Sequence, residues 1–381
     1  MARRPRDTVA IESVQGTGDF AIVVDRATQY DVTTDLTQPS EALFEMGDSG
    51  TWSALRSALE TGGRYRVVVN DRVRLTGRLL SKALPVSANS GATVQVTVRT
   101  RLADAMFTTC DPGISVHNAT LQDVVLAAYR NMGLTAADFI LDPALARDLL
   151  SGKGGGLSRP ADLTEMKEDA AKPHPPETVY AFAERHLNRF HLTHWDAPDG
   201  RIVVGAPNDE QAPSYHLQIL RDGPDAYFNN LLSAEKTEDY EQVPVSLWVY
   251  GVGGGRDQGK AKVTFVQADP VMVAISPALD RSAVIIDEAL TTQAQAEARA
   301  RREMSLRSLM KDAWRLETWG LSYWDGQQRI DYGIDTVANV HVAVTGGAAG
   351  AYLVYRCSFR GDASRGHTTE LLTTAKGIWR L

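Results

Sequence analysis

Three histidines that lie close together in the sequence are the first candidates for chemistry. His186, His191 and His194 could offer imidazole nitrogens to a zinc ion, which in structural sites takes four converging ligands. His186 falls near the end of a predicted helix, however, and His191 and His194 are three residues apart on a predicted strand. Their side chains are therefore expected on opposite faces, and no nearby cysteine completes a set. The sequence predicts no metal site here.

Two aspartates are the second candidates. Asp196 and Asp199 could be the paired carboxylates of a glycosidase, in which a pocket must raise one of the two pKa values. They flank Pro198 and precede Gly200, and aspartate is favoured at such positions because its side chain bonds the backbone of a turn. Turn formation explains both residues, so we predict no catalytic role for them.

A glycine-rich segment partly matches a phosphate-binding loop. Gly254 is followed by four residues and then by Gly259-Lys260, but Ala261 stands where a hydroxyl would hold magnesium. The next segment, Lys262–Val266, is a predicted strand, whereas a phosphate loop leads into a helix N-terminus. Gly251-Val-Gly253 fails as a dinucleotide fingerprint for the same reason. We therefore expect a hairpin loop and no bound cofactor.

The composition indicates a soluble protein of several domains. A chain of 381 residues predicts roughly two to four domains. The formal net charge of −7 gives no general reason to bind nucleic acid. No secretion signal follows the N-terminal arginines, and we predict no membrane insertion. The uncharged stretch Thr336–Tyr355 contains alternating valines and Gly346-Gly347, which predict two strands and a turn.

The two cysteines, Cys110 and Cys357, lie far apart in the sequence and form no metal-ligand spacing. We expect both to be buried and reduced, as is usual in a cytoplasmic protein, and a disulfide between them is the alternative. Without a disulfide or a metal, the fold must be stabilised by packing alone.

The first hundred residues predict a β-barrel or a β-sandwich. Val94, Val96 and Val98 alternate with polar residues, as in a strand with one buried face. Asn70-Asp71 is a predicted tight turn. Further predicted strands and a short crossing helix complete this region: Phe20–Val24, Arg64–Val69, Val73–Leu80, and the helix over Thr51–Leu59.

Residues from about Leu102 to Pro207 predict an α+β region. Thr120 is a suitable N-cap for a helix that Gly133 ends, and a second helix follows Pro175-Pro176. Two exposed loops and a β-hairpin complete the region: Ser151–Gly156, Lys167–Pro176, and Phe190–Trp195 with Arg201–Gly205.

A third region begins near Ser214. It contains two predicted strands, Val243–Tyr250 and Lys262–Gln267, and the longest helix, which Thr291 or Thr292 caps and which runs to about Lys311. The remainder returns to strands, which suggests a β domain built from discontinuous pieces. Four aromatic residues follow the helix, and they either pack beneath it or anchor a subunit interface: Trp314, Trp319, Tyr323 and Trp324.

The order of these segments resembles the baseplate hub family of Mu-like contractile-tail phages, which is related to the N-terminal half of type VI secretion spike proteins. Four stretches carry the resemblance: Tyr65–Asp104; Pro175–Glu184 with His191–Val204; Phe228–Leu232 with Val245–Gly251; and Thr291–Arg302 leading to Trp319-Gly320 and Asp335–Val337. The chain departs from the family in its long polar loop at about Ser151–Lys172 and in its glycine-rich loop at Gly251–Lys260.

The resemblance implies an α+β, mainly β fold with two barrel-like β domains, one of them discontinuous, and two smaller α+β domains. The implied boundaries are 1–103 for the first barrel-like domain and 209–240 with 325–381 for the second. The α+β domains are 104–208 and an insertion with the long helix at 241–324.

The resemblance also implies a structural role without catalytic, cofactor-binding or metal-binding residues. A homotrimer would join the six-fold tail tube to the three-fold central spike and leave a channel through which genomic DNA passes without specific binding. The implied partners are the spike, the tail tube or tube-initiator protein, the baseplate wedge proteins and the tape measure protein. The chain ends at Leu381 without the β-helix of type VI spikes, so a separate spike subunit is expected.

Two other functions stay open. A hub of a related contractile injection system, such as an R-type bacteriocin or a type VI-like apparatus, would have the same sequence features. A tail-tip cell-wall hydrolase would need Asp199 or His191 to converge with other polar groups in a cleft. For the hub of a phage, we expect the protein in the virion tail baseplate after assembly in the host cytoplasm.

Overall fold

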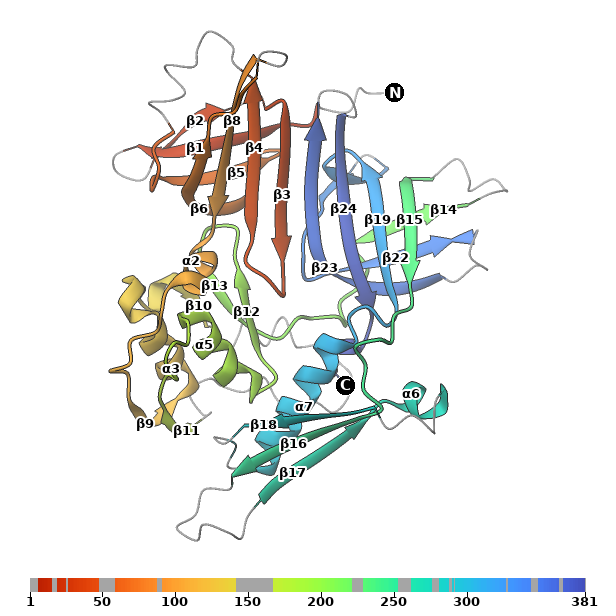
Figure 1. Cartoon of the computed structure of the whole chain (residues 1–381). Coiled ribbons are helices and arrows are strands. Elements are labelled where there is room, and N and C mark those ends of the chain that lie inside the picture. The colour runs from red at the N-terminus through yellow and green to blue at the C-terminus, as the bar shows by residue number, and fades with distance from the viewer. Residues whose placement is uncertain are drawn as a thin grey trace.

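A computed structural model shows two β units side by side, with smaller α+β units beneath them (Figure 1). The structure describes residues 6–15, 19–24, 27–47, 59–87, 91–141, 167–220, 229–252, 262–275, 281–287, 290, 292–326, 328–343, 349–362 and 366–380. The described elements are mainly β strands arranged in several sheets, which confirms the predicted mainly β class.

The N-terminal β unit is a run of antiparallel strands, ordered β3-β4-β8-β6-β5-β1-β2 with β7 beside β8. Its strands are β1 (Val9–Gln15), β2 (Asp19–Val24), β3 (Gln29–Asp35), β4 (Glu41–Gly47), β5 (Arg64–Val69), β6 (Arg72–Ala83), β7 (Val86–Ser87) and β8 (Gly91–Arg99). Val94, Val96 and Val98 are buried, as their alternation predicted. Asn70 and Asp71 have φ angles of 50° and 63°, a left-handed pair that confirms the tight turn.

The C-terminal β unit continues the same sheet. Its strands are β14 (Tyr215–Ile219), β15 (Leu231–Thr237), β19 (Ala313–Trp319), β22 (Thr336–Val342), β23 (Ala349–Asp362) and β24 (Gly366–Ala375). β22 and β23 pair antiparallel, which confirms the two strands predicted within Thr336–Tyr355, and the expected turn at Gly346-Gly347 lies outside the described residues.

One strand pairing joins the two β units. β23 pairs with β3 from Arg356 opposite Asp35 to Asp362 opposite Gln29, and the described strands thus form one 14-stranded sheet. Buried side chains from both β units form one common core. None of the described sheets closes into a barrel, so the barrel-like description and the four domain boundaries stay predictions.

The second region is α+β, as predicted. Its elements are α2 (Arg101–Phe107), β9 (Val116–Thr120), α3 (Leu121–Tyr129), η1 (Arg130–Met132), η2 (Ala136–Asp138), β10 (Phe139–Ile140), β11 (Lys167–Ala171), α5 (Val179–Asn188), β12 (Thr193–Asp196) and β13 (Ile202–Gly205). Thr120 caps α3 in a capping box with Asp123, and Gly133 follows the helix with a φ of 73°. β12 and β13 form the predicted hairpin.

One predicted loop in this region is partly wrong. Lys167–Ala171, the first half of the expected loop Lys167–Pro176, is strand β11 and pairs antiparallel with β9. Its composition does not favour a strand, and its pairing with Val116–Thr120 holds it extended. The other expected loop, Ser151–Gly156, and the expected helix at Thr51–Leu59 except for Leu59 lie outside the described residues.

The third region places a long helix on a small sheet of order β17-β16-β18. Its elements are β16 (Ser246–Val252), β17 (Lys262–Ala268), α6 (Pro270–Ile275), β18 (Ser282–Ile286) and α7 (Gln293–Arg307), and it leads on to β20 (Ser322–Asp325) and β21 (Gln328–Asp331). Thr292 caps α7 in a capping box with Gln295, as predicted, and the helix ends at Arg307 instead of about Lys311. A 3₁₀ turn, η5 (Ile378–Arg380), lies against α7. None of the described helices is both long and apolar enough to cross a membrane.

Candidate functional site

The three histidines of the zinc hypothesis take part in separate contacts. The Nδ1 atom of His194 lies 3.0 Å from an oxygen of Glu184, and the Nε2 atom of His191 lies 2.5 Å from the carbonyl oxygen of Trp379. His186 is buried against the ring of Phe182. Burial lowers the pKa of His191 to about 4. No group of three or more candidate metal ligands converges among the described residues.

The sequence predicted that His191 and His194 lie on one strand with their side chains on opposite faces. That prediction is wrong, because the two residues do not share a strand. His191 precedes β12 and has a left-handed φ of 58°. This conformation, not strand alternation, turns its ring toward the C-terminal segment.

Asp196 and Asp199, the candidate carboxylate pair, have different environments. Asp199 accepts a 3.0 Å bond from the backbone N–H of Arg201, which confirms its role in the turn. Asp196 does not bond the turn, and that part of the prediction was wrong. Its Oδ2 atom accepts 2.8 Å bonds from the backbone N–H of Ser40 and from the hydroxyl of Thr100. Burial raises the pKa of Asp196 to about 6 in spite of these bonds.

Both cysteines are free and buried, which confirms the prediction of reduced thiols. Burial raises the pKa of Cys110 to about 11 and that of Cys357 to about 12, so neither thiol ionises readily. The glycine-rich segment Gly254–Lys260 lies outside the described residues, and the segment that follows it is strand β17, as predicted.

Of the four aromatic residues after the long helix, two lie in a core that is separate from the one beneath α7. Trp314 and Tyr323 are buried in the core shared by the two β units, where Trp314 contacts Tyr352 edge-on. α7 packs on a separate core. Trp319 has 64% of its surface exposed, which leaves the interface interpretation open for this residue.

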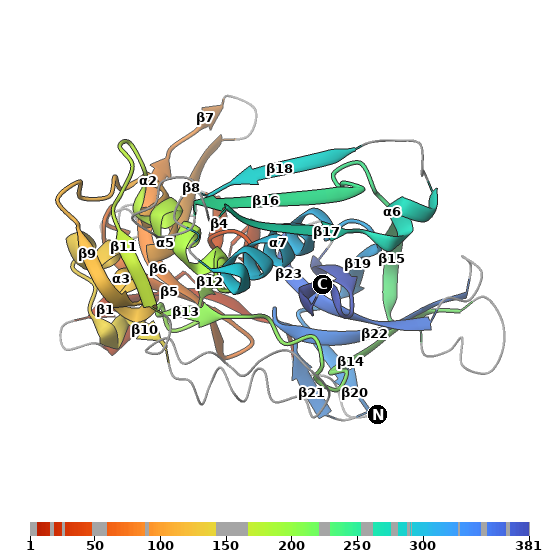
Figure 2. The same cartoon turned by 90° about the horizontal axis from the view of Figure 1, so that it is seen from below.

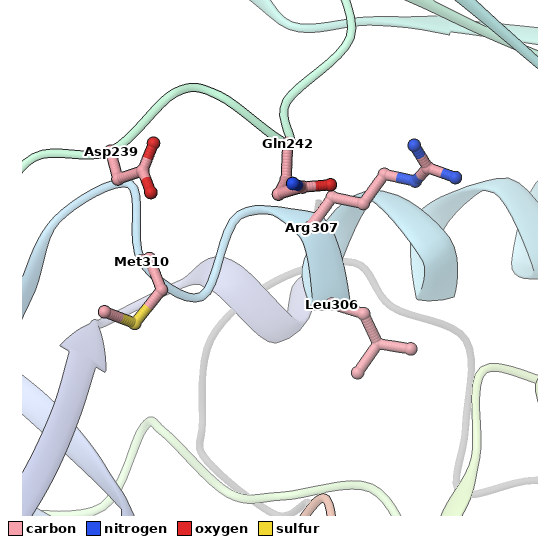
Figure 3. A pocket seen from close by; sticks show the side chains of 5 residues that line it. All are labelled: Asp239, Gln242, Leu306, Arg307 and Met310. Atoms are coloured by element: carbon pink, nitrogen blue, oxygen red, sulfur yellow. The ribbon is translucent and has the colours of Figure 1, made fainter.

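A cavity of about 250 Å³ lies at the end of α7 (Figure 3). Its lining residues come from α7 and from the connections on either side of the small sheet: Asp239, Gln242, Leu306, Arg307 and Met310. The Arg307 guanidinium bonds to Glu303 on its own helix, 2.8 Å away. This cavity brings together one carboxylate and one guanidinium that is already paired, and it joins none of the residues considered for catalysis.

A buried group of charges joins the second and third regions, and we call it the junction. Arg189, after α5, makes a two-fold contact of 3.0 and 2.9 Å with the carboxylate of Asp287, after β18. Arg302 on α7 lies 3.3 Å from Glu184 on α5, which also contacts His194. Burial alone would raise the pKa of Glu184, but its bond to His194 and the nearby charges of His194 and Arg302 lower it.

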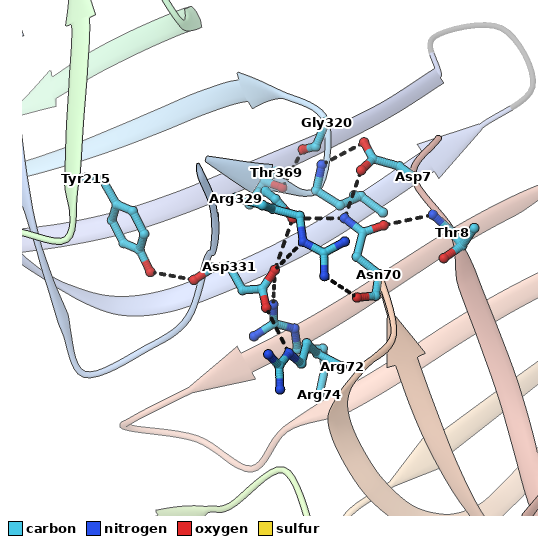
Figure 4. A network of polar contacts seen from close by, with 12 residues as sticks. Asp7, Thr8, Asn70, Arg72, Arg74, Tyr215, Gly320, Arg329, Asp331 and Thr369 are labelled. Carbon is cyan, nitrogen blue, oxygen red and sulfur yellow. Dashed lines mark hydrogen bonds and ion pairs between the residues drawn. The ribbon is translucent and has the colours of Figure 1, made fainter. Parts of the chain in front are cut away.

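A second polar network joins the two β units, and we call it the seam (Figure 4). The carboxylate of Asp7 accepts bonds from the side-chain amide of Asn70 at 2.8 Å and from the backbone of Leu321 at 3.0 Å. The side-chain oxygen of Asn70 accepts from the backbone of Thr8, and its carbonyl accepts from Arg329. The tight turn at Asn70 thus fixes the position of the hairpin that begins after β19.

Three arginines surround a single aspartate in the seam. Arg72, Arg74 and Arg329 each place a guanidinium nitrogen 3.6 Å from an oxygen of Asp331. The side chain of Arg72 is 70% exposed. These distances are beyond direct hydrogen bonding, so the contact is a loose ion group in which Arg72 is open to water, whereas the side chain of Arg74 is only 13% exposed.

No sequence signal singled out the ion pairs of the junction. Arg189, Arg302 and Asp287 are charged residues in ordinary helix and strand contexts, and their partners lie up to 118 positions away. A buried ion pair of this kind becomes visible only when the fold brings the two segments together.

No protein-family model matches the chain, and no curated protein matches its sequence. Solved structures do share its fold. The tail protein from Neisseria meningitidis MC58 is 16% identical, with a TM-score of 0.72 and 98% of each chain covered. The 43 kDa tail protein of prophage MuSo2 from Shewanella oneidensis is 14% identical, with a TM-score of 0.69, and the match covers 98% of this chain and 99% of that one.

A more distant likeness extends to secretion systems. The E. coli c3393 protein, a component of the type VI secretion system, is 8% identical with a TM-score of 0.51, and the match covers 92% of this chain and 73% of that one. The chain thus has the fold of phage tail proteins and of a type VI component, which confirms the resemblance found in the sequence.

Proposed function

We propose that this chain is a structural baseplate hub of a contractile phage tail. The observation that carries the proposal is a match over nearly the full length of two tail proteins, one of them from a Mu-like prophage. Tail proteins of this fold are structural components, and we propose a structural role without catalysis here. The protein would then reside in the tail baseplate of the virion after assembly in the host cytoplasm.

We propose a homotrimer in which each copy contributes two tube-like domains. Residues 1–103 would form one, and residues 209–240 with 325–381 would form the other. Three copies would then present six similar domains to the six-fold tail tube or its initiator protein. The continuous sheet supports this arrangement, because the pairing of β3 with β23 and the polar seam hold the two β units in a fixed relation.

The two α+β domains, 104–208 and 241–324, would contact the central spike and the baseplate wedge proteins. The similarity to the type VI component supports a spike-type partner. One further structural neighbour belongs to a PdpA–VgrG complex; it is 9% identical with a TM-score of 0.52, and the match covers 98% of this chain and 65% of that one. The tape measure protein would approach from the tube side.

A channel for the genome follows from the ring arrangement. The formal net charge of −7 suits such a role, because a wall that repels phosphate lets DNA pass without binding. A cryo-EM reconstruction of isolated tails tests the whole proposal. Three copies of this chain between tube and spike, around an acidic lumen, are expected; a basic lumen or a peripheral location contradicts it.

The alternative of a related contractile injection system rests on the same fold and is separated by the genes that adjoin this one. Capsid and terminase genes indicate a phage; their absence beside a complete tail cluster indicates a bacteriocin or secretion device. The hydrolase alternative predicts that Asp199→Asn or His191→Ala abolishes peptidoglycan cleavage by the purified protein. Both side chains form hydrogen bonds that hold the fold, so we expect neither substitution to reduce peptidoglycan cleavage.

A further inference from the structure

The sheet that runs through both β units has one face that no described helix covers. Six of its strands lie side by side in the order β15-β19-β24-β23-β3-β4, and no helix lies across them in Figure 1. The shared core lies on their other face, where β14 and the hairpin β20-β21 pack, as Figure 2 shows from below. Side chains alternate along a strand, so the residues between the core residues point away from the core. We call the surface that they form the outward face.

The strand register makes the outward face continuous over both β units. Glu317 on β19 lies opposite Glu370 on β24, and Glu370 lies opposite Ser358 on β23. Across the joint between the units, Ser358 lies opposite Thr33 on β3, and Thr33 lies opposite Glu41 on β4. Residues that pair directly across a ladder lie on the same side of a sheet. These five polar residues therefore form one row on a single surface.

One glutamate on the outward face holds two arginines. Arg360 on β23 donates to Glu370 at 2.8 Å and to Asp31 on β3 at 2.9 Å. Arg315 on β19 donates to the same oxygen of Glu370 at 2.7 Å. The side chains of Arg315 and Arg360 are 56% and 38% exposed, so both guanidiniums reach the solvent. Burial alone would raise the pKa of Glu370, but the bonds from Arg360 and Arg315 lower it.

The other charges of the six strands leave the outward face acidic. Arg356, the third arginine on it, lies 3.7 Å from the carboxylate of Asp35. Lys236 on β15 lies opposite Trp314, a residue of the shared core, and is therefore on the other side of the sheet. Further carboxylates share the outward face with Glu370: Glu41, Glu45, Glu235 and Glu317. Each arginine of the face is thus paired, and carboxylates are in excess.

Paired arginines on an acidic surface behave differently toward DNA from free ones. A free guanidinium that binds phosphate releases counterions from the DNA, and each such contact raises the affinity for any sequence. A guanidinium that already donates to carboxylates has its charge offset, so phosphate gains little by replacing them. The arginines have a structural task of their own, because Arg360 ties β3 to β24 across the joint between the two β units.

We propose that the outward face lines the genome channel and that Glu370, by neutralising Arg315 and Arg360, keeps these arginines from binding the phosphates of passing DNA. This inference rests on the proposed hub and deepens it, because it assigns the channel wall to one face and its low affinity for DNA to one glutamate. The face extends over both β units without interruption, and three copies would present it six times around the channel.

Glu370→Gln tests the role of the glutamate. The substitution keeps the size of the side chain and removes its charge, so Arg315 loses this carboxylate and Arg360 keeps that of Asp31. The purified variant should bind a labelled DNA duplex at least about tenfold more tightly than the unchanged protein, as measured by fluorescence anisotropy at low salt. The gain should shrink as salt is added. Combining Glu370→Gln with Arg315→Gln restores the net charge and removes the freed guanidinium, so the affinity should fall back.

Glu303→Gln is the matched control away from the outward face. Glu303 on α7 also holds two arginines, Arg299 at 3.0 Å and Arg307 at 2.8 Å, so the variant has the same change in net charge and loses the same number of ion pairs. Its affinity for the duplex should rise clearly less.

The outcomes separate this inference from the hub proposal. Tight binding by the unchanged protein, no gain in Glu370→Gln, an equal gain in Glu303→Gln or continued binding by the double variant overturns the role of Glu370 and leaves the hub proposal standing. A cryo-EM reconstruction of tails in which three copies join tube to spike, but turn this face away from the lumen, overturns the assignment of the wall alone. A reconstruction without the chain between tube and spike overturns both proposals.

Discussion

Two groups of charged side chains join distant parts of this chain, and they differ in how much water reaches them. At the junction, Arg189 and Arg302 are almost fully buried and contact Asp287 and Glu184. At the seam, the carboxylate of Asp331 has three arginines at 3.6 Å, one of which is mostly exposed. The number of charges is similar, but the geometry and the solvation are not.

The comparison indicates that the stability lost when one partner of an ion pair is removed depends on whether water can solvate the charge of the other partner. A buried arginine without its carboxylate keeps a charge that water cannot solvate, so the folded state is strongly destabilised. At the seam, water reaches the mostly exposed guanidinium of Arg72, and surface pairs of that kind contribute about 0 to 1 kcal/mol. We therefore expect the junction to be rigid and the seam to tolerate substitution of its exposed arginine, Arg72.

The largest effect is expected at Asp287. Asp287→Ala removes the carboxylate that faces the buried Arg189 guanidinium and should lower the free energy of unfolding by about 3 to 5 kcal/mol. Urea denaturation monitored by circular dichroism measures it. Asp331→Ala is the matched control in the seam and should cost clearly less; equal losses in the two variants would contradict the comparison.

A buried carboxylate without a cation sharpens the comparison. Asp335 accepts a bond from the backbone of Asn208, and burial raises its pKa to about 7. The folded protein then holds a proton that the unfolded chain releases, so this group's contribution to stability falls as the pH rises from about 4 to 7 and is constant above.

Asp335→Asn keeps the acceptor and removes the charge. It should raise the free energy of unfolding at about pH 8 by about 2 kcal/mol or more and have little effect near pH 4. Denaturation at both pH values checks it, with Asp199→Asn in the exposed turn as the control. A variant that is destabilised equally at both pH values would show that the carboxylate is not strained by burial.

Within the seam, the hydrogen bonds should matter more than the ions. Asn70→Gly preserves the left-handed turn but removes the bonds to Asp7 and Thr8, and should cost about 1 to 2 kcal/mol. Differential scanning calorimetry measures the loss. Asp71→Gly, at the neighbouring left-handed position, controls for the added backbone freedom and should cost less.

The smallest effect is expected at Arg72. Arg72→Ala should change the free energy of unfolding by less than about 0.5 kcal/mol, because its guanidinium is mostly exposed and two other arginines face the same carboxylate. Urea denaturation at low and high salt checks this. A loss above about 2 kcal/mol would place Arg72 in the same class as the junction arginines.

Local signals predicted most of the elements. Thr120 and Thr292 cap helices through a local pattern, in which the threonine hydroxyl and the side chain three residues later bond the first turn. In Val94–Val98, the alternation of apolar and polar residues predicts which face of the strand is buried. Long-range partners produced the errors. Lys167–Ala171 is extended because of its pairing with β9, and Asp196 bonds Ser40, which is 156 positions away.

The same limit applies to the candidate sites. The role of Asp199 in the turn was predicted correctly, because it depends only on the aspartate side chain and the backbone N–H of the residue two positions later. Val284 and Ile286 on β18 lie in a strand-like sequence, but their exposure depends on which face of the small sheet α7 covers. The fold class and the family resemblance followed from segment order, whereas contact surfaces required the assembled sheet.

The mass of the purified protein in solution, with and without the spike protein encoded beside it, tests the central claim most directly. Light scattering should give a trimer, or a monomer that becomes a complex of three hub and three spike chains when the spike is added. A stable monomer that ignores the spike and cleaves peptidoglycan would contradict the structural hub and return attention to Asp199 and His191.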